Sequence, residues 1–397
     1  MTSEQKERTP LNEALKKLTV ALCEQGFAAG TETVSVTESA GRITAEPVCA
    51  VLNVPHYDAS AMDGITTRAE LVRSASDSHP VTLSADQYTV VDTGDPVTET
   101  HDTVVMKEYT LPGDGGTIQV TRAVPQGKNI RPTGEDIKAG EELLEAYVRI
   151  TPAAVGAMIA GGVNEVSVLK RPVIGFIPTG DEIIPPGRAP APGEITDFNS
   201  SVFAAMLREW QADVRLYPIT PDKKDLLQTA LAKALDECDF VLLGAGSSTG
   251  RDDYTVEIIA QTGTVLAHGL AVKPGRPTIV GYKDAKPLIG IPGYPVAGVI
   301  ILREVVKPVI DLWYHGWSEP RCYCDVSLAE GIKSKPHLEE FARVHFAEED
   351  ADPPLAVPHQ RGSGSISEYM RSDGILRIPV GCDGYAAGDV VTIELLD

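Results

Sequence analysis

The sequence predicts a multidomain chain in which a doubly wound parallel α/β domain is combined with β-rich domains on both sides. Three stretches of different texture support this fold class. Between residues 171 and 312, short apolar runs alternate with helical patterns. Residues 81–149 and 321–397 instead contain short β-type runs and turns. With 397 residues, the chain is long enough for two to four domains.

The first element is an amphipathic helix over residues 11–25, where leucines and alanines recur at helical spacing. A strand is expected at residues 31–36, and short strands follow through residues 81–120. Residues 152–162 form a second helix made mostly of small residues. Small side chains favour close packing against another helix or a second subunit.

The α/β part is predicted from the alternation of five apolar runs with four helical patterns. The strands are expected at residues 173–177, 214–217, 240–243, 278–281 and 287–291. The helices are expected at residues 200–209, 224–235, 254–261 and 296–312. Ligands of such sheets bind beyond the carboxyl ends of the strands, so the loops there are the candidate site.

The loop at residues 244–253 joins a buried run to a helical pattern and is rich in Gly, Ser and Thr. Free backbone N–H groups at such a turn suit a phosphate, and the hydroxyl groups add donors. Asp252 and Asp253 would repel a bare anion, so we expect Mg²⁺ to lie between acid and phosphate. An ordinary turn with Asp252 as the helix N-cap explains the same residues.

Other loops of the same edge add further acids and two cations. They carry Asp181, Glu182, Asp197, Asp222, Lys273 and Arg276. Each acid alone is also explained as an N-cap, and Asp197 is well placed to cap the helix at Ser200. Their shared edge favours a site in which carboxylates hold Mg²⁺ and the cations offset a negative substrate.

Polar loops of the N-terminal half form a second candidate region. Residues 54–64 carry Asp58, Ser60 and Asp63, whereas Thr93 and Asp136 lie in later loops. Turn chemistry, in which Asp and Ser cap their own backbone, is an equal alternative. In the C-terminal part, residues 362–367 are expected to form a flexible polar loop.

Composition excludes several classes of protein. The net charge of −21 argues against nonspecific nucleic-acid binding. No apolar run reaches the length of a membrane span, and the N-terminus lacks an apolar signal region, so we expect a cytoplasmic protein. The six cysteines form no CxxC pair, which favours reduced thiols over zinc ligands or disulfides.

The order of short motifs resembles the molybdopterin molybdenumtransferase family, which includes MoeA and the gephyrin E domain. Each motif is weak alone, whereas seven in the family's order are specific. They are residues 60–64 (Ser-Ala-Met-Asp-Gly), 93–94 (Thr-Gly), 134–136 (Gly-Glu-Asp), 179–182 (Thr-Gly-Asp-Glu), the Gly/Ser loop ending at Asp253-Tyr254, 273–275 (Lys-Pro-Gly) and 292–295 (Pro-Gly-Tyr-Pro).

The resemblance implies four domains. An elongated N-terminal domain would comprise residues 1–30, 37–50 and 141–171, with a small inserted β domain at residues 31–36 and 51–140. An α/β molybdopterin-binding domain would span residues 172–318, and a C-terminal β-barrel domain residues 319–397. The family further implies a homodimer whose site lies between the α/β domain of one subunit and the N-terminal half of the other.

The resemblance also implies an activity, the insertion of molybdate or tungstate into adenylylated molybdopterin with Mg²⁺-dependent release of AMP. The catalytic residues would be Asp63, Glu182, Asp222, Asp253 and Lys273, of which Glu182, Asp222 and Asp253 would hold the metal. Substrate-binding residues would be Thr93, Asp136, Gly246, Ser247, Ser248, Arg276, Pro292 and Pro295. Nucleic acid and membrane are not expected as partners.

Three departures from the family pattern indicate a divergent branch. The Gly/Ser loop is altered, Tyr294 stands where an Asn is usual, and Gly269 stands where a second Lys is common. A non-catalytic molybdopterin-binding or scaffold protein of the same fold is therefore an alternative, as is a related pterin- or nucleotide-binding enzyme such as the adenylyltransferase that makes the substrate.

Overall fold

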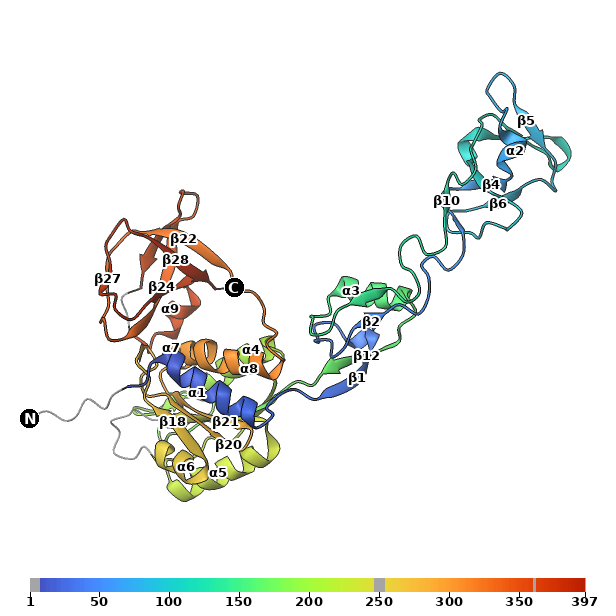
Figure 1. Cartoon of the computed structure of the whole chain (residues 1–397). Helices are drawn as coiled ribbons and strands as arrows, with labels where there is room; N and C mark the ends of the chain where they lie inside the picture. The colour runs from blue at the N-terminus through green and yellow to red at the C-terminus, as the bar shows by residue number, and fades with distance from the viewer. Residues whose placement is uncertain (1–7, 246–253, 360–361, 397) are drawn as a thin grey trace, which may run out of the picture. The chain divides into compact units, whose positions relative to one another are not determined.

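The computed structural model describes residues 8–245, 254–359 and 362–396. The chain divides into two compact units (Figure 1). Unit 1 comprises residues 1–30 and 170–397, and unit 2 comprises residues 31–169. The backbone N–H of Lys170 donates to the carbonyl oxygen of Gly30 at 2.8 Å. The chain therefore leaves unit 1 and re-enters it at neighbouring positions.

Unit 1 contains a six-stranded sheet in the order β16-β13-β17-β21-β20-β18. Its strands are β13 (Val173–Ile177), β16 (Asp213–Leu216), β17 (Phe240–Ala245), β18 (Thr264–His268), β20 (Ile279–Lys283) and β21 (Lys286–Pro292). The strands β16, β13, β17 and β21 are parallel, as predicted. The expected strand at residues 278–281 is antiparallel instead, because β20 and β21 are joined by two residues, a loop too short for a crossover.

Helices cover both faces of this sheet, with α5 and α6 on one face and α1, α4, α7 and α8 on the other (Figure 1). They are α1 (Leu11–Glu24), α4 (Asn199–Glu209), α5 (Lys224–Glu237), α6 (Thr255–Thr262), α7 (Pro295–Ile301) and α8 (Lys307–Trp313). The expected single helix over residues 296–312 is divided by a π-helical turn at Leu302–Val306. Pro308 accounts for this turn, because proline lacks an N–H group and its ring clashes with the preceding helical turn.

The C-terminal part of unit 1 forms the predicted closed β-barrel. Its strands are β22 (Tyr323–Leu328), β24 (Glu339–Glu348), β25 (Leu355–Pro358), β26 (Gly374–Ile378) and β28 (Val390–Leu395). The barrel closes because β24 pairs with both β25 and β26. Helix α9 (Ile366–Met370) shortens the polar loop expected at residues 362–367, and a small pair, β23 (Ile332–Lys333) and β27 (Gly384–Tyr385), lies beside the barrel.

Four charged side chains connect the barrel to the helices of the α/β domain. Arg321 Nη1 lies 2.9 Å from both Glu304 Oε1 and Glu394 Oε2, and Arg303 forms an ion pair with Glu394. Glu304 and Glu394 are largely buried, so removing either arginine would leave a carboxylate short of a counter-charge.

Unit 2 is built from small sheets around two separate cores. One core includes α3 (Pro152–Ala160) and the paired strands β1 (Thr31–Ser35) and β12 (Glu165–Leu169). The other includes β4 (Gly64–Thr67), α2 (Ala69–Val72) and β5 (Val81–Leu83). The remaining strands are β2 (Val48–Cys49), β3 (Ala59–Ser60), β6 (Thr89–Val91), β7 (Thr103–Met106), β8 (Thr110–Pro112), β9 (Ile118–Val120), β10 (Ile130–Arg131) and β11 (Glu142–Leu144). The exact domain boundaries stay a prediction.

Two findings bear on the class of protein. In the described residues, no helix has both the length and the apolar character needed to cross a membrane. All six cysteines are free thiols, as expected from their spacing.

The packing of α7 on α4 predicts a large effect for a small substitution. A Cβ atom on Gly298 would lie 2.3 Å from Cζ of the buried Phe203 ring. We expect Gly298→Ala to lower the free energy of unfolding by about 2 kcal/mol, measured by chemical denaturation, because the ring cannot move within a packed core. Adding Phe203→Leu should recover part of that loss, and a strictly additive double variant would contradict the assignment.

Candidate functional site

The carboxyl edge of the parallel strands holds two of the three predicted metal ligands on adjacent loops. Glu182 follows β13 and Asp222 follows β16. Thr179 and Thr220 form a parallel bridge between these loops, and the Gly180 N–H donates to the Thr220 oxygen at 3.3 Å. The Asp222 N–H donates to Asp181 Oδ1 at 3.3 Å. The backbone therefore fixes both loops at one place on the edge.

The side chain of Glu182 lies over Gly180. Glu182 Oε2 lies 3.0 Å from where a Cβ atom on Gly180 would be, and Gly180 has a φ of 137°. A larger residue at 180 would therefore displace the carboxylate. The third predicted ligand, Asp253, lies outside the described residues, as do Gly246, Ser247, Ser248 and Asp252.

The carboxylate oxygens on these two loops are of the ligand type that Mg²⁺ prefers. Carboxylate oxygens are hard ligands, and Asp181 and Glu182 are exposed, so an ion bound there keeps water ligands. Within residues 8–245, 254–359 and 362–396, no three His, Cys, Asp or Glu side chains form a metal-binding group. The described residues thus include two of the three predicted metal ligands, Glu182 and Asp222.

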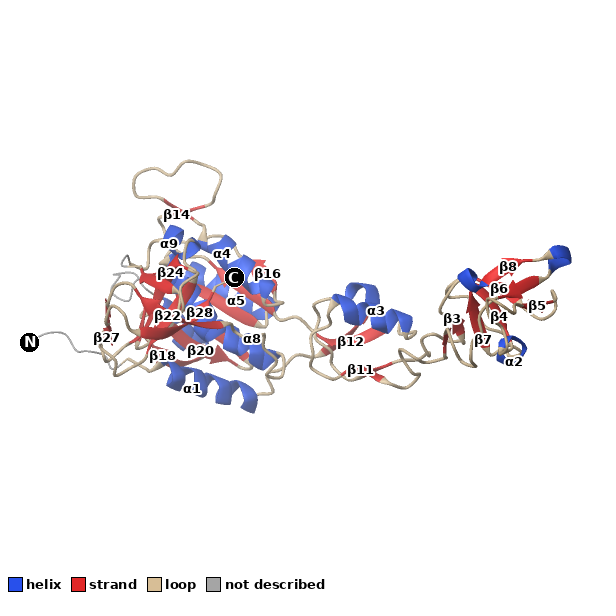
Figure 2. Cartoon of the chain, turned by 90° about the horizontal axis from the view of Figure 1, so that it is seen from above, coloured by secondary structure: helices blue, strands red, loops and turns tan. Residues whose placement is uncertain are grey.

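A projecting loop follows Glu182 directly. It begins at β14 (Ile183–Ile184), returns at β15 (Ile195–Thr196) and leads into α4 (Figure 2). Asp197 Oδ1 accepts from the Ser200 N–H at 3.0 Å. The predicted capping role of Asp197 is confirmed, so this carboxylate serves the helix.

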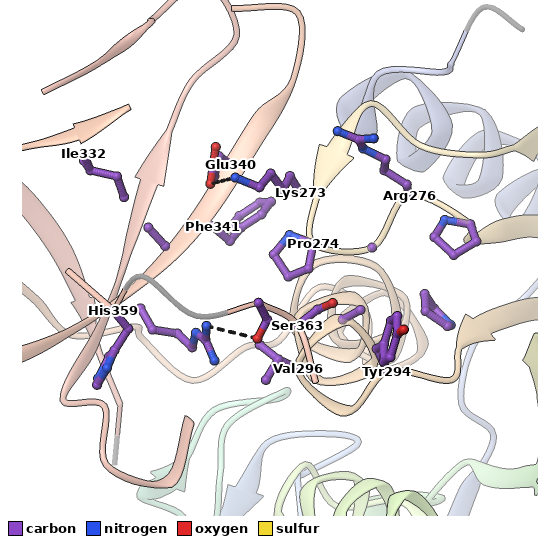
Figure 3. A pocket seen from close by; sticks show the side chains of 17 residues that line it. Lys273, Pro274, Arg276, Tyr294, Val296, Ile332, Glu340, Phe341, His359 and Ser363 are labelled. Carbon is purple, nitrogen blue, oxygen red and sulfur yellow. Dashed lines mark hydrogen bonds and ion pairs between the residues drawn. The ribbon is translucent and has the colours of Figure 1, made fainter. Parts of the chain in front are cut away.

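A pocket of about 440 Å³ lies farther along the same edge. The α/β domain contributes residues 273–277, Pro292 and Tyr294, and the barrel contributes residues 340–343 and 362–363 (Figure 3). The sheet order places β21 and β20 here, beyond β17 from the acidic loops. The predicted residues Lys273, Arg276 and Pro292 thus line one cavity.

Lys273 is paired with a carboxylate that the sequence did not single out. Lys273 Nζ lies 2.5 Å from Glu340 Oε1, and the two side chains point toward one another (Figure 3). Glu340 is only 7% exposed, and its second oxygen accepts from Ser334 Oγ at 3.0 Å. The strand β19 (Val272–Lys273) pairs with β24, which sets these two side chains side by side.

Arg343 is a second pocket residue that sequence reasoning missed. It is 5% exposed, its Nη2 lies 3.8 Å from Glu368 Oε2, and burial lowers its pKa while Glu368 opposes that shift. Glu340 and Arg343 lie in the buried stretch of β24 among Phe341, Ala342 and Val344, a pattern that could have indicated buried, functional charges.

Pro292 and Pro295 act through the backbone. Pro292 is the last residue of β21, and Pro295 is the first residue of α7. Both are buried, whereas Tyr294 between them is 66% exposed at the pocket. The prolines therefore fix the loop that presents Tyr294.

In unit 2, Asp63 and Thr93 come together as a hydrogen-bonded pair. Asp63 Oδ1 accepts from the Thr93 hydroxyl at 2.8 Å and from the Thr93 N–H at 2.7 Å. Asp58 makes the same contacts with Thr133, at 2.9 Å and 2.8 Å. These bonds lower the pKa of both carboxyl groups. Local turn chemistry is therefore present only at Ser60, whose hydroxyl donates to the Met62 oxygen at 2.6 Å, whereas both aspartates bond to other loops.

Asp136, the remaining predicted residue of unit 2, belongs to the same group of loops. It is exposed, and its N–H donates to the Val54 oxygen at 2.9 Å. Ser60 pairs with Ile130, and its carbonyl accepts from the Gly94 N–H. Backbone hydrogen bonds therefore connect the segments of unit 2 that carry Asp63, Thr93 and Asp136.

Comparisons with known proteins cover nearly the whole chain. Residues 9–162 match the MoeA N-terminal region (domain I and II), residues 175–311 a "probable molybdopterin binding domain", and residues 325–396 the MoeA C-terminal region (domain IV). A molybdopterin molybdenumtransferase from Nostoc sp. is 31% identical over 92% of this chain and 89% of that protein. This chain belongs to the MoeA family.

Other MoeA-family proteins agree. The molybdopterin molybdenumtransferase of Bacillus subtilis is 29% identical over 98% of this chain and 94% of that protein. Two structures of a molybdopterin biosynthesis MoeA protein from Pyrococcus horikoshii superpose with TM-scores of 0.82 and 0.75, at 27% and 28% identity. Each covers 98% of this chain and at least 99% of its own. The predicted family, fold class and enzyme class are confirmed, whereas the roles of the site residues stay predictions.

The two Asp–Thr pairs predict different responses to loss of the threonine hydroxyl. For Asp63 the hydroxyl of Thr93 lowers the pKa most, whereas for Asp58 the N–H of Thr133 does. We expect Thr93→Ala to raise the pKa of Asp63 more than Thr133→Ala raises that of Asp58, as measured by NMR titration of the carboxyl carbons.

The sign of the linked stability effect follows from these directions. Each carboxyl has a folded-state pKa below its unfolded value, so its contribution is present above the unfolded pKa and is lost as the pH falls through the folded pKa. Unchanged carboxyl titrations in both variants would contradict the hydrogen-bond assignment.

Proposed function

We propose that this chain inserts molybdate, or the related tungstate, into adenylylated molybdopterin and releases AMP with the help of Mg²⁺. Its family membership supports the reaction class. The observation that carries the proposal is the division of one sheet edge between acidic loops and a cation-lined pocket. A metal-assisted phosphoanhydride cleavage and a tetrahedral oxyanion need these two environments close together.

The pocket suits the oxyanion. Lys273, Arg276 and Arg343 place three cations around about 440 Å³, and only Glu340 among the lining residues is acidic. Arginine and lysine donors stabilise tetrahedral oxyanions through charge-assisted hydrogen bonds. Lys273 would exchange Glu340 for the oxyanion or share its three donors between them.

The acidic loops suit the metal. Glu182 and Asp222, with Asp253 from the loop after β17, are the residues we assign to Mg²⁺. When bound, Mg²⁺ supplies charge neutralisation to the phosphoanhydride. We assign no general base among these acids.

The chain's own residues would then act by position. The cations of the pocket would hold the oxyanion while the two dithiolene thiols of the pterin replace one oxo ligand of the metal, which leaves with their two protons as water. A second water molecule attacks the phosphoanhydride, so its P–O bond breaks, AMP leaves and the other phosphate stays on the pterin. Tyr294 lines the pocket and is 66% exposed, so its ring would be available to contact a planar pterin. Holding both reactants at one edge of the sheet would lower the entropic part of the activation barrier for metal insertion.

A homodimer would complete the site with Asp63, Thr93 and Asp136 of a partner. Unit 2 carries an exposed apolar patch formed by Val51 (63% exposed), Leu52 (50%) and Ile159 (51%). The N–H groups of Val51 and Leu52 both donate to the Gly161 oxygen, which places them beside the end of α3. An apolar helix whose small residues face solvent is suited to packing against a second copy.

A single assay separates turnover from the scaffold alternative. Purified protein is incubated with adenylylated molybdopterin, Mg²⁺ and either molybdate or tungstate, and AMP is measured. Release of AMP that depends on the oxyanion supports the proposal. Binding of the pterin without AMP release with either oxyanion would support the scaffold.

Loss of one carboxylate should reduce turnover without unfolding the protein. We expect Glu182→Gln, Asp222→Asn and Asp253→Ala each to lower AMP release by at least about 100-fold, because the metal loses a ligand. Asp225→Asn, an exposed acid in the first turn of α5, is the matched control. Turnover that survives in the three variants would reject the metal assignment.

A site shared between subunits predicts recovery of activity in mixed dimers. Asp63→Asn and Asp222→Asn should each be inactive alone. A heterodimer of the two contains one intact site, so co-expression should restore about a quarter of wild-type turnover. Ile159→Glu, which charges the apolar patch, should yield monomers in sedimentation and abolish the recovery, whereas Leu111→Glu on β8 should not. Co-expressed dimers as inactive as either parent would rule out a shared site.

A further inference from the structure

A third arginine, Arg8, stands beside the pocket on the N-terminal segment that precedes α1. Thr9 forms a parallel bridge with Leu270; its N–H donates to the Gly269 oxygen at 3.2 Å, and its oxygen accepts from the Ala271 N–H at 2.9 Å. This pairing continues directly into β19, which carries Lys273. Arg8 is therefore fixed next to the strand that enters the pocket.

Arg8 and Arg276 meet at Gly269. A Cβ atom on Gly269 would lie 3.4 Å from the Arg276 oxygen and 4.0 Å from Arg8 Cγ. The Leu270 N–H donates to that same Arg276 oxygen at 3.0 Å. Arg276 extends from the pocket loop toward the N-terminal segment (Figure 3). Gly269 therefore lies against both the Arg8 side chain and the Arg276 backbone.

The two guanidinium groups repel one another. Burial lowers the pKa of Arg276 most, the charge of Arg8 lowers it further, and the opposing effect of Glu340 is smaller. Both carboxylate oxygens of Glu340 already accept hydrogen bonds, one from Lys273 and the other from Ser334. Neither arginine has an ion pair or a hydrogen bond from its side chain to residues of the described ranges. Arg8 is exposed and Arg276 is partly exposed, so the donors of both guanidinium groups are open to an anion in a chain with 56 acidic and 35 basic residues.

We propose that Arg8 and Arg276 form a subsite for a tetrahedral dianion at the edge of the pocket. The group received is either the free oxyanion or a phosphate of the pterin substrate, which share charge and shape. This identity rests on the proposed function, whereas the anion subsite itself does not. Paired guanidinium groups offer several N–H donors in fixed planes, which match the oxygens of a tetrahedral anion.

Binding measured on the full-length protein tests the subsite. Calorimetric titrations with molybdate alone and with inorganic pyrophosphate alone distinguish the two sources of the anion. We expect Arg8→Gln to weaken the affinity for one of the two anions about tenfold, because a charge-assisted hydrogen bond is lost. Arg8→Lys should recover part of that affinity. Lys16→Gln, an exposed cation on α1, removes the same charge as a control and should leave both affinities unchanged.

The melting temperature without ligand separates binding from a structural role. Arg8→Gln relieves the repulsion on Arg276, so the variant should melt no lower than wild type, whereas its stabilisation by the bound anion should fall. The difference in affinity should shrink at high salt because Arg8 is exposed. Equal affinities of wild type and Arg8→Gln for both anions would overturn the subsite. Anion binding that depends on Arg8 without AMP release would instead reject the proposed reaction and keep the subsite.

Discussion

The attachment of the barrel to the α/β domain at β19 and β24 determines the geometry of the pocket. Val272 pairs with Glu339 and Lys273 with Glu340, so two backbone positions and one ion pair join strands that are far apart in sequence. Glu340 is buried, which makes its charge tolerable only while Lys273 and Ser334 neutralise and hold it. The pocket residues of both domains are thereby brought to one cavity, and the network around Arg321 supports the same arrangement from the helical side.

Charge is sorted along the sheet edge. The acidic loops follow β13 and β16, whereas the pocket cations lie at β21, β20 and the barrel, with β17 between the two groups. A protein with a net charge of −21 has little general attraction for an oxyanion. Under the proposed function, the local excess of cations would provide this attraction, and the acids at the other end would offer oxygen ligands to a divalent ion.

Local patterns predicted much of this molecule, and tertiary contacts account for the rest. The strands β13, β17 and β21 are apolar runs buried on both faces, so composition alone located them. The edge shared by Glu182, Asp222 and Lys273 followed from strand direction, although β20 reaches that edge as an antiparallel strand. Glu340 and Arg8 could not be assigned, because their roles depend on pairing with β19 and Leu270, which no periodicity encodes. The threonine partners of Asp58 and Asp63 were hidden for the same reason, since they lie 75 and 30 residues away.

Helix α1 has a consequence for the order in which the chain matures. Its buried side chains, Leu11, Ala14, Leu18 and Leu22, pack against β18, β20 and β21, which are synthesised more than 200 residues later. During translation this apolar stripe emerges from the ribosome long before its binding surface exists, while residues 31–169 already contain both of their own cores. The nascent chain must therefore carry an exposed hydrophobic segment through much of its synthesis, a state in which holdase chaperones find their substrates, and the domain that contains α1 is among the last to close.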